Sequence, residues 1–190
     1  MKMEYDFVVK RPINDVWHSF KDIPTVASCM PGAELTEDLG EGNYKGNVKV
    51  KLGPFSVSFD GQAKVNFEDN TKSGDVVGNG IDKKGGNRTK LSMKFFLEKV
   101  PEGTKTNIDA DIQLSGAIAQ FGRIGIIKET ANIIIRKFSE NLENKLSESH
   151  SEENDSNIKS TTDNKESHIS LGIIFNGLIK WFLNLFLSKK

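Results

Sequence analysis

The chain has 190 residues, enough for one ordinary domain with appendages but not for two full domains. Lys plus Arg balances Asp plus Glu at 26 each, and no basic cluster stands out, which argues against nucleic acid as a main partner. A single cysteine, Cys29, excludes an internal disulfide. The first residues lack the apolar run of a signal peptide, so we expect the folded part to stay in the cytoplasm.

The N-terminal segment predicts a strand followed by short helices. Residues 3–9 alternate apolar and polar side chains, as in a strand with one buried face. Pro12 suits the first turn of a helix, and "INDVWHSF" continues it. Pro24 and Pro31 then interrupt the chain, which predicts short helical pieces before the next strand.

The centre of the chain predicts an antiparallel sheet. Apolar and polar residues alternate in 44–52, 55–67, 91–97 and 108–114, and Gly53-Pro54 forms a turn between the first two of these strands. One apolar and one polar face per strand is typical of an antiparallel sheet that is covered on one side only. "GNGIDKKGG" lacks the spacing of a phosphate-binding loop and predicts a glycine-rich strand and hairpin.

Residues 117–146 predict the cover of this sheet. Apolar side chains recur there at helical spacing, and one helix of that length would measure about 40 Å, enough to cross the sheet. The order is a strand, short helices, about six strands and a long helix. It predicts an α+β fold, in which a curved antiparallel sheet of about seven strands is wrapped on a long C-terminal helix.

Two further segments follow the predicted domain, 1–146. Residues 147–168 are rich in Ser, Glu, Asn, Asp and Lys, and cannot bury enough apolar surface to offset the entropy of ordering. We predict a disordered linker there, with a root-mean-square span of roughly 25 Å. The third segment, 169–190, is strongly apolar and ends in two lysines.

The apolar segment predicts a membrane-anchoring helix. Between 169 and 187 Lys180 is the only charged residue, but its cost makes spanning a bilayer nearly break-even. Asn176, Lys180 and Asn184 form one polar stripe, so we favour an in-plane helix over a spanning tail anchor, on the cytoplasmic face of the cell membrane. The predicted membrane-contacting residues are Leu171, Ile174, Phe175, Leu178, Trp181, Phe182, Leu185, Phe186, Lys189 and Lys190.

Candidate catalytic chemistry is sparse. Of the histidines, only His18 lies in the predicted domain, and no histidine pairs with Cys29 at a metal-ligand spacing. We therefore predict no metal site, no covalent cofactor and no catalytic residue. Cys29 in "SCMPG" is interpreted as a small, half-buried hydrophobic residue rather than a nucleophile.

The inward apolar face has two interpretations, because a core and a hydrophobic pocket look alike in sequence. Gly61 on that face leaves room under the helix, which fits a ligand cavity or a bend in the sheet equally well. We predict that part of the face lines a pocket for a hydrophobic small molecule, with these candidates: Phe55, Phe59, Phe67, Phe95, Ile112, Phe121, Ile124 and Ile127.

Four stretches resemble one known family in matching order: "CMPGAEL", "GNYKGNVKVKLGPFSVSFDGQAKV", "GNGIDKKGG" and "AQFGRIGI". The family is that of the G subunit of carbon monoxide dehydrogenase, and the resemblance covers nearly all of 1–146. It implies the helix-grip fold of the START-related lipid-binding superfamily.

The resemblance also implies a function. Such proteins are non-enzymatic accessories that bring a molybdenum hydroxylase of the carbon monoxide dehydrogenase type to the cytoplasmic membrane, and they are thought to hold a respiratory quinone in the helix-grip cavity. Two alternatives remain open. One is a lipid carrier without an oxidoreductase partner. The other is a cyclase or hydrolase that uses the same cavity, which would need an acid–base pair among inward positions that are almost all apolar.

Overall fold

The fold is described from a computed structural model, in which residues 1–53, 55–123 and 125–156 are described. Residues 1–153 form one compact unit. Its elements in chain order are β1 (Lys2–Val9), α1 (Ile13–Lys21), α2 (Ile23–Cys29), β2 (Ala33–Gly40), β3 (Asn43–Leu52), β4 (Phe55–Glu68), β5 (Ser73–Asp82), β6 (Asn87–Val100), β7 (Gly103–Ser115), the 3₁₀ helix η1 (Ala117–Arg123) and α3 (Ile126–Ser156).

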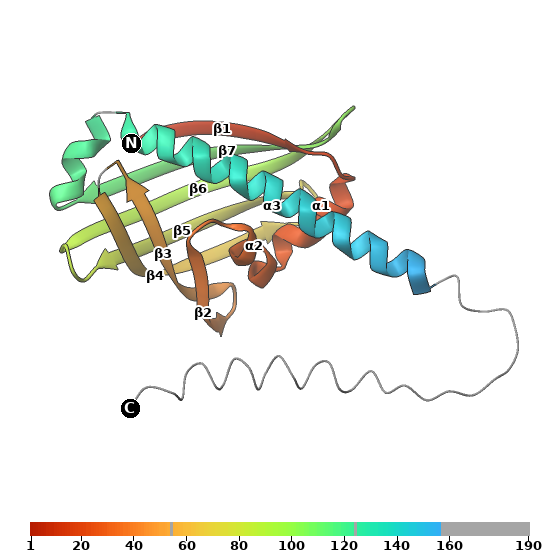
Figure 1. Cartoon of the computed structure of the whole chain (residues 1–190), viewed down its shortest axis with the longest axis horizontal. Coiled ribbons are helices and arrows are strands. Elements are labelled where there is room, and N and C mark those ends of the chain that lie inside the picture. Colours follow the sequence, from red (N-terminus) through yellow and green to blue (C-terminus); the bar gives the residue numbers. More distant parts are fainter. Residues whose placement is uncertain (54, 124, 157–190) are drawn as a thin grey trace, which may run out of the picture. The chain divides into compact units, whose positions relative to one another are not determined.

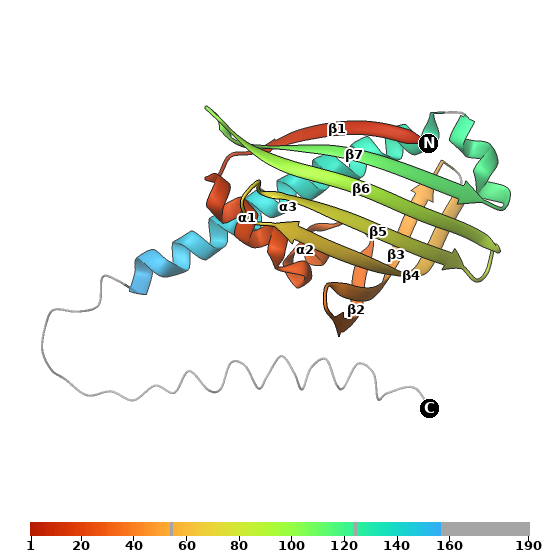
Figure 2. The same cartoon turned by 180° about the vertical axis from the view of Figure 1, so that it is seen from behind.

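The seven strands form a single antiparallel sheet in the order β1-β7-β6-β5-β4-β3-β2. The sheet curves around α3, which crosses its concave face in Figure 1, and Figure 2 shows the opposite, convex face. The predicted α+β architecture of about seven strands gripping a C-terminal helix is thereby confirmed.

Alternation along the strands places the apolar side chains on the concave face. On β4, Val57 and Phe59 are buried whereas Ser56 and Asp60 are exposed. The buried side chains form two clusters, one beside α1 and one near the start of α3. The first contains Val9, Val16, Trp17, Cys29, Phe95, Leu97, Phe138, Leu142 and Leu146, and the second contains Met3, Leu52, Val57, Phe59, Ile118 and Ile127.

The long helix begins later than the sequence predicts. Residues 117–123 form η1 instead, and α3 starts at Ile126. Gly125, between the two elements, has φ of 73°, and Gly116, before η1, has φ of 89°. A residue in this left-handed region cannot continue a right-handed helix, so the single helix expected from 117 is divided.

The helix also ends later than predicted. It continues to Ser156, so residues 147–156 are helical, although the sequence predicts a disordered linker from 147. No Gly or Pro occurs between Ile126 and Ser156 to interrupt the helix, and glutamate, which is frequent in its last turns, is a good helix former. The remainder of the predicted linker and the whole predicted anchor lie in 157–190, outside the described residues. Within the described ranges, no helix is long and apolar enough to cross a bilayer.

Side-chain hydrogen bonds fix the second half of α3 to its surroundings. Ser139 Oγ donates to the carbonyl oxygen of Val8 in β1 (3.2 Å), and Asn141 Nδ2 donates to the carbonyl oxygen of Cys29 at the end of α2 (2.9 Å). This half of the helix also supplies Phe138 to the first apolar cluster. The first half of α3 lies over a different part of the sheet.

Candidate functional site

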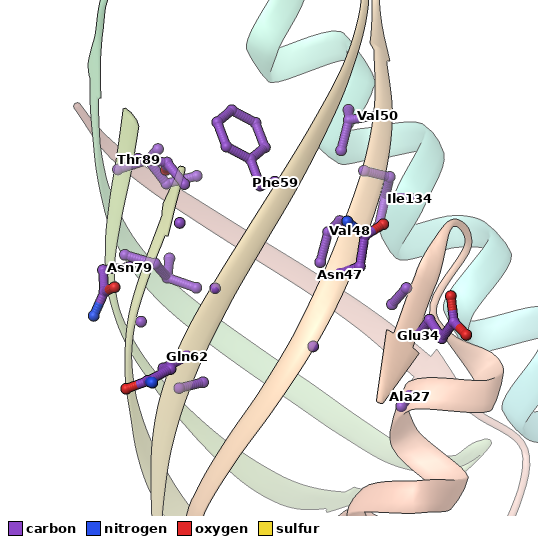
Figure 3. Close-up of a pocket in the computed structure, with 18 of the residues that line it drawn as sticks. Ala27, Glu34, Asn47, Val48, Val50, Phe59, Gln62, Asn79, Thr89 and Ile134 are labelled. Atoms are coloured by element: carbon purple, nitrogen blue, oxygen red, sulfur yellow. The ribbon is translucent and has the colours of Figure 1, made fainter. Parts of the chain in front are cut away.

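A cavity of about 400 Å³ lies between the concave face and the first half of α3. This volume falls within the range typical of small-molecule sites. In Figure 3 the lining residues come from β3, β4 and β5, with Ile134 of α3 and Ala27 of α2 across from the strands. Its larger apolar side chains include Phe59, Leu91, Ile112, Leu114, Ile127 and Ile134.

The cavity exists because three neighbouring strands carry no large side chain at this place. Gly46 of β3 pairs with Gly61 of β4, which pairs in turn with Gly80 of β5. In the next inward row, Ala63 of β4 pairs with Gly78 of β5. We call these five residues the glycine floor; all of them line the cavity.

Two of the floor glycines are required by the backbone itself. A Cβ on Gly61 would collide with the carbonyl oxygen of Asn79, and a Cβ on Gly46 would lie 2.7 Å from the carbonyl oxygen of Glu34. Real Cβ atoms do not approach a carbonyl oxygen so closely, so glycine allows this close approach of neighbouring backbones. The floor is therefore built from the main chain.

Few polar groups enter this apolar space. Thr130 Oγ1 donates to the carbonyl oxygen of Lys51 at 3.4 Å, which joins α3 to β3 at one end of the cavity. The hydroxyls of Tyr44 and Thr89 have no hydrogen-bond partner among the described residues, although both residues line the cavity. Burial raises the pKa of Tyr44, and the nearby carboxylate of Asp38 adds to the rise, so its phenol stays a protonated donor.

The cavity opens beside the edge of the sheet. Glu34 of β2 and Val48 of β3 line it and are exposed, whereas the residues deeper in the lining, such as Phe59, are buried. Glu34 is the only carboxylate among the described lining residues, and it lies at this opening. The interior therefore offers hydrogen-bonding hydroxyls and apolar surface, without a paired acid and base.

Three of the predicted pocket residues line the cavity, namely Phe59, Ile112 and Ile127. Phe67 and Phe95 do not. They pack against each other with ring centroids 6.3 Å apart, in the core cluster beside α1. The sequence places them on the correct face, but the helices α1 and α3 fill that end of the face with side chains.

The other three predicted pocket residues are Phe55, Phe121 and Ile124. Phe55 lies at the start of β4, where its side chain is 46% exposed, beside the β3–β4 turn and away from the lining. Phe121 belongs to η1, and its side chain is outside the described part. Ile124 lies outside the described residues.

Most of the glycine floor is not recognisable from the sequence. Gly61 stands out as a source of space, but Gly46, Gly78 and Gly80 join it only through the register of three strands. Alternation places Tyr44 correctly on the inward face without indicating a role for it. The signal that was available is the repeated small residue at inward positions of adjacent strands.

No metal or nucleophile site is formed by the described side chains. Within residues 1–53, 55–123 and 125–156, no three His, Cys, Asp or Glu side chains group as metal ligands. Cys29 is 2% exposed, and burial raises the pKa of its thiol, so it acts as a packing residue of the first cluster.

Several solved structures share this fold. A conserved protein from Geobacillus kaustophilus is 17% identical with a TM-score of 0.69, covering 78% of this chain and 97% of its own. A protein from Thermus thermophilus is 10% identical with a TM-score of 0.57, covering 78% and 99%. The Zhui aromatase/cyclase from Streptomyces sp. R1128 is 11% identical with a TM-score of 0.51, covering 77% and 93%. At these identities the likeness shows the helix-grip fold alone.

The sequence comparison is more specific. No curated protein matches the chain. The family model of the carbon monoxide dehydrogenase G subunit (CoxG) matches residues 6–147, which include all of β2 to β7 and the first two thirds of α3. The chain therefore belongs to the CoxG family of carbon monoxide dehydrogenase.

Proposed function

We propose that this protein is a non-enzymatic accessory protein that holds a hydrophobic small molecule in the cavity under α3. The observation that carries the proposal is the apolar cavity of about 400 Å³ with a floor made of backbone. A packed interior normally excludes voids larger than a water molecule, so a space of this size favours a ligand.

A respiratory quinone is the ligand that we propose. Its ring carries carbonyl oxygens, which can accept hydrogen bonds, and the hydroxyls of Tyr44 and Thr89 are the available donors. The volume suits a ring and the beginning of an isoprenoid tail, and the opening at Val48 gives the rest of the tail a way out. The quinone would be bound without a covalent link.

The family name ties the chain to carbon monoxide dehydrogenase, and we propose a molybdenum hydroxylase of that type as its partner. Recruitment would work through residues 169–190, which would hold the protein on the cytoplasmic face of the cell membrane. A tethered adaptor raises the local concentration of a soluble partner near the membrane. The quinone would then carry electrons from the hydroxylase into the membrane.

An enzyme of the cyclase or hydrolase type is the alternative function. The likeness to an aromatase/cyclase concerns the fold, and such chemistry needs an acid and a base at the reacting atoms. Among the described lining residues Glu34 is the only carboxylate, and it is exposed at the opening. This arrangement supports a binding protein over an enzyme. A lipid carrier without an oxidoreductase partner would have the same cavity, and co-purification with a hydroxylase distinguishes it.

A blocked cavity tests the proposal. Ala131 of α3 lines the cavity and the adjacent Asn132 does not, so Ala131→Trp and Asn132→Trp form a matched pair of variants in the full chain. We expect 2-methyl-1,4-naphthoquinone, measured by equilibrium dialysis, to bind to the wild type and to Asn132→Trp but not to Ala131→Trp. Equal binding to both variants, or no binding to the wild type, would show that the cavity is not the ligand site.

A further inference from the structure

Building on the ligand-binding function proposed above, we propose that the cavity selects a thin, planar ring lying flat on the glycine floor. Ala63 and Gly78 are the residues that determine this specificity. The chemical class is a ring system, one or two rings wide, that carries hydrogen-bond-accepting oxygens at its edges.

The dimensions of the floor favour a flat ring. Its Gly46–Gly61–Gly80 row crosses three hydrogen-bonded strands, so two strand spacings of about 4.8 Å give it a width of about 10 Å. Consecutive inward residues of one strand, such as Gly61 and Ala63, lie about 7 Å apart. The area without large side chains therefore matches one or two fused rings.

The surface that faces such a ring is flat as well. Peptide groups are planar, and without side chains a strand presents these groups and Cα atoms directly to a ligand. On the opposite side, α3 contributes the small side chain of Ala131 to the lining. Phe59, whose side chain is labelled in Figure 3, is the aromatic residue of this lining next to the Gly61 position on β4.

The two hydroxyls without partners among the described residues flank the floor in the sheet. Tyr44 of β3 pairs directly with Ala63, and Thr89 of β6 pairs directly with Gly80. The donors thus approach from the β3 side and from the β6 side, with β4 and β5 between them. A ring with oxygens at opposite edges can satisfy both donors, whereas a saturated chain can satisfy neither along its length.

The floor also offers positions where the proposal can be tested without damage to the fold. A Cβ on Gly78 would lie 3.4 Å from the carbonyl oxygen of Gln62 and 3.7 Å from Ala63 Cβ, which are tolerable distances. Ala63 already directs its Cβ to the concave face. The neighbouring Lys64 is exposed on the convex face of the same strand, which makes it the matched control.

The experiment compares two probes on the full chain by equilibrium dialysis, 2-methyl-1,4-naphthoquinone as the planar ring and 1-dodecanol as the flexible saturated chain. We expect Ala63→Leu to weaken naphthoquinone binding by about tenfold or more, because the added side chain occupies the space of the ring. Dodecanol affinity should change by less than about threefold, since a flexible chain can bend around the new side chain. Lys64→Leu should leave both affinities unchanged, and Gly78→Ala should give a smaller loss for naphthoquinone only.

The outcomes separate this inference from the proposed function. If Ala63→Leu and Gly78→Ala bind naphthoquinone as the wild type does while Ala131→Trp does not, the ligand uses the cavity but not the floor, and the inference is wrong. An equal loss for both probes would also refute planar selection. If the wild type binds neither probe, the proposed function itself fails.

Discussion

The ring of Phe67 meets the indole of Trp17 edge to face, with centroids 5.7 Å apart and 86° between the ring planes. Phe95 and Phe20 continue the group at 5.4 Å, and Phe20 packs on Phe138 of α3 at 6.0 Å. This aromatic cluster fills the concave face beside α1. The empty space is confined to the other end of the face, where the glycine floor lies, so stability and ligand binding depend on different residues.

Replacement of Phe67 should therefore affect stability alone. Phe67→Leu loses ring contacts with Trp17 and Phe95, and we expect the free energy of unfolding to fall by about 1–2 kcal/mol. Urea unfolding measures this loss. The naphthoquinone affinity of the folded variant should stay within about twofold of the wild type. A tenfold loss of affinity would mean that the cluster contributes to the ligand site after all.

Asn87 joins the β5–β6 hairpin to η1. Its Oδ1 accepts a hydrogen bond from the backbone N–H of Ile118 (3.2 Å), and its Nδ2 donates to Asp82 Oδ2 (2.8 Å). Asn87→Ala leaves the buried N–H of Ile118 without a partner, which should cost about 1–3 kcal/mol of unfolding free energy. Asn66→Ala, at an exposed position of β4, should change it by less than about 0.5 kcal/mol. Equal effects of the two variants would contradict this role.

The same pair predicts a pH dependence. The hydrogen bond from Asn87, and then that from the backbone of Gly85, lower the pKa of Asp82 below its usual value. A depressed folded-state pKa stabilises the fold above the unfolded value of about 3.9, and this contribution is lost as the pH falls through the folded pKa. Asp82→Asn should thus be less stable than the wild type at neutral pH, and the difference should shrink in acid. A difference that is constant from neutral pH into strong acid would refute the linkage.

Removal of residues 157–190 tests the membrane anchor, which the sequence alone predicts. The truncation keeps all of α3, because the helix ends at Ser156. We expect the full chain to float with liposomes that contain anionic lipids and the truncated chain to remain in the dense fraction. Flotation of both proteins would place the membrane contact in the domain instead.

Local patterns are enough to predict the sheet and its apolar face. Alternation along 55–67 identifies Val57 and Phe59 as inward residues, because a strand has a side-chain period of two. Alternation does not reveal which end of a face is covered, and this is why the sequence groups Phe67 and Phe95 with the cavity. Their place is decided by Trp17 and Phe138, which are distant in sequence.

The limits of the long helix and the floor of the cavity depend on less local information. Gly125 is visible in the sequence, but a glycine inside a helical pattern can be tolerated, and only its φ of 73° shows that the helix is divided there. Gly46, Gly61 and Gly80 become neighbours through strand register, which short-range patterns do not specify.

The most direct test of ligand binding is native mass spectrometry of the full chain purified from its source membranes, followed by solvent extraction and identification of any bound small molecule. We predict one prenylated quinone per chain, lost in Ala131→Trp and retained in Asn132→Trp. A chain that is empty, or that carries the same molecule in both variants, would contradict the claim that the cavity under α3 holds the ligand.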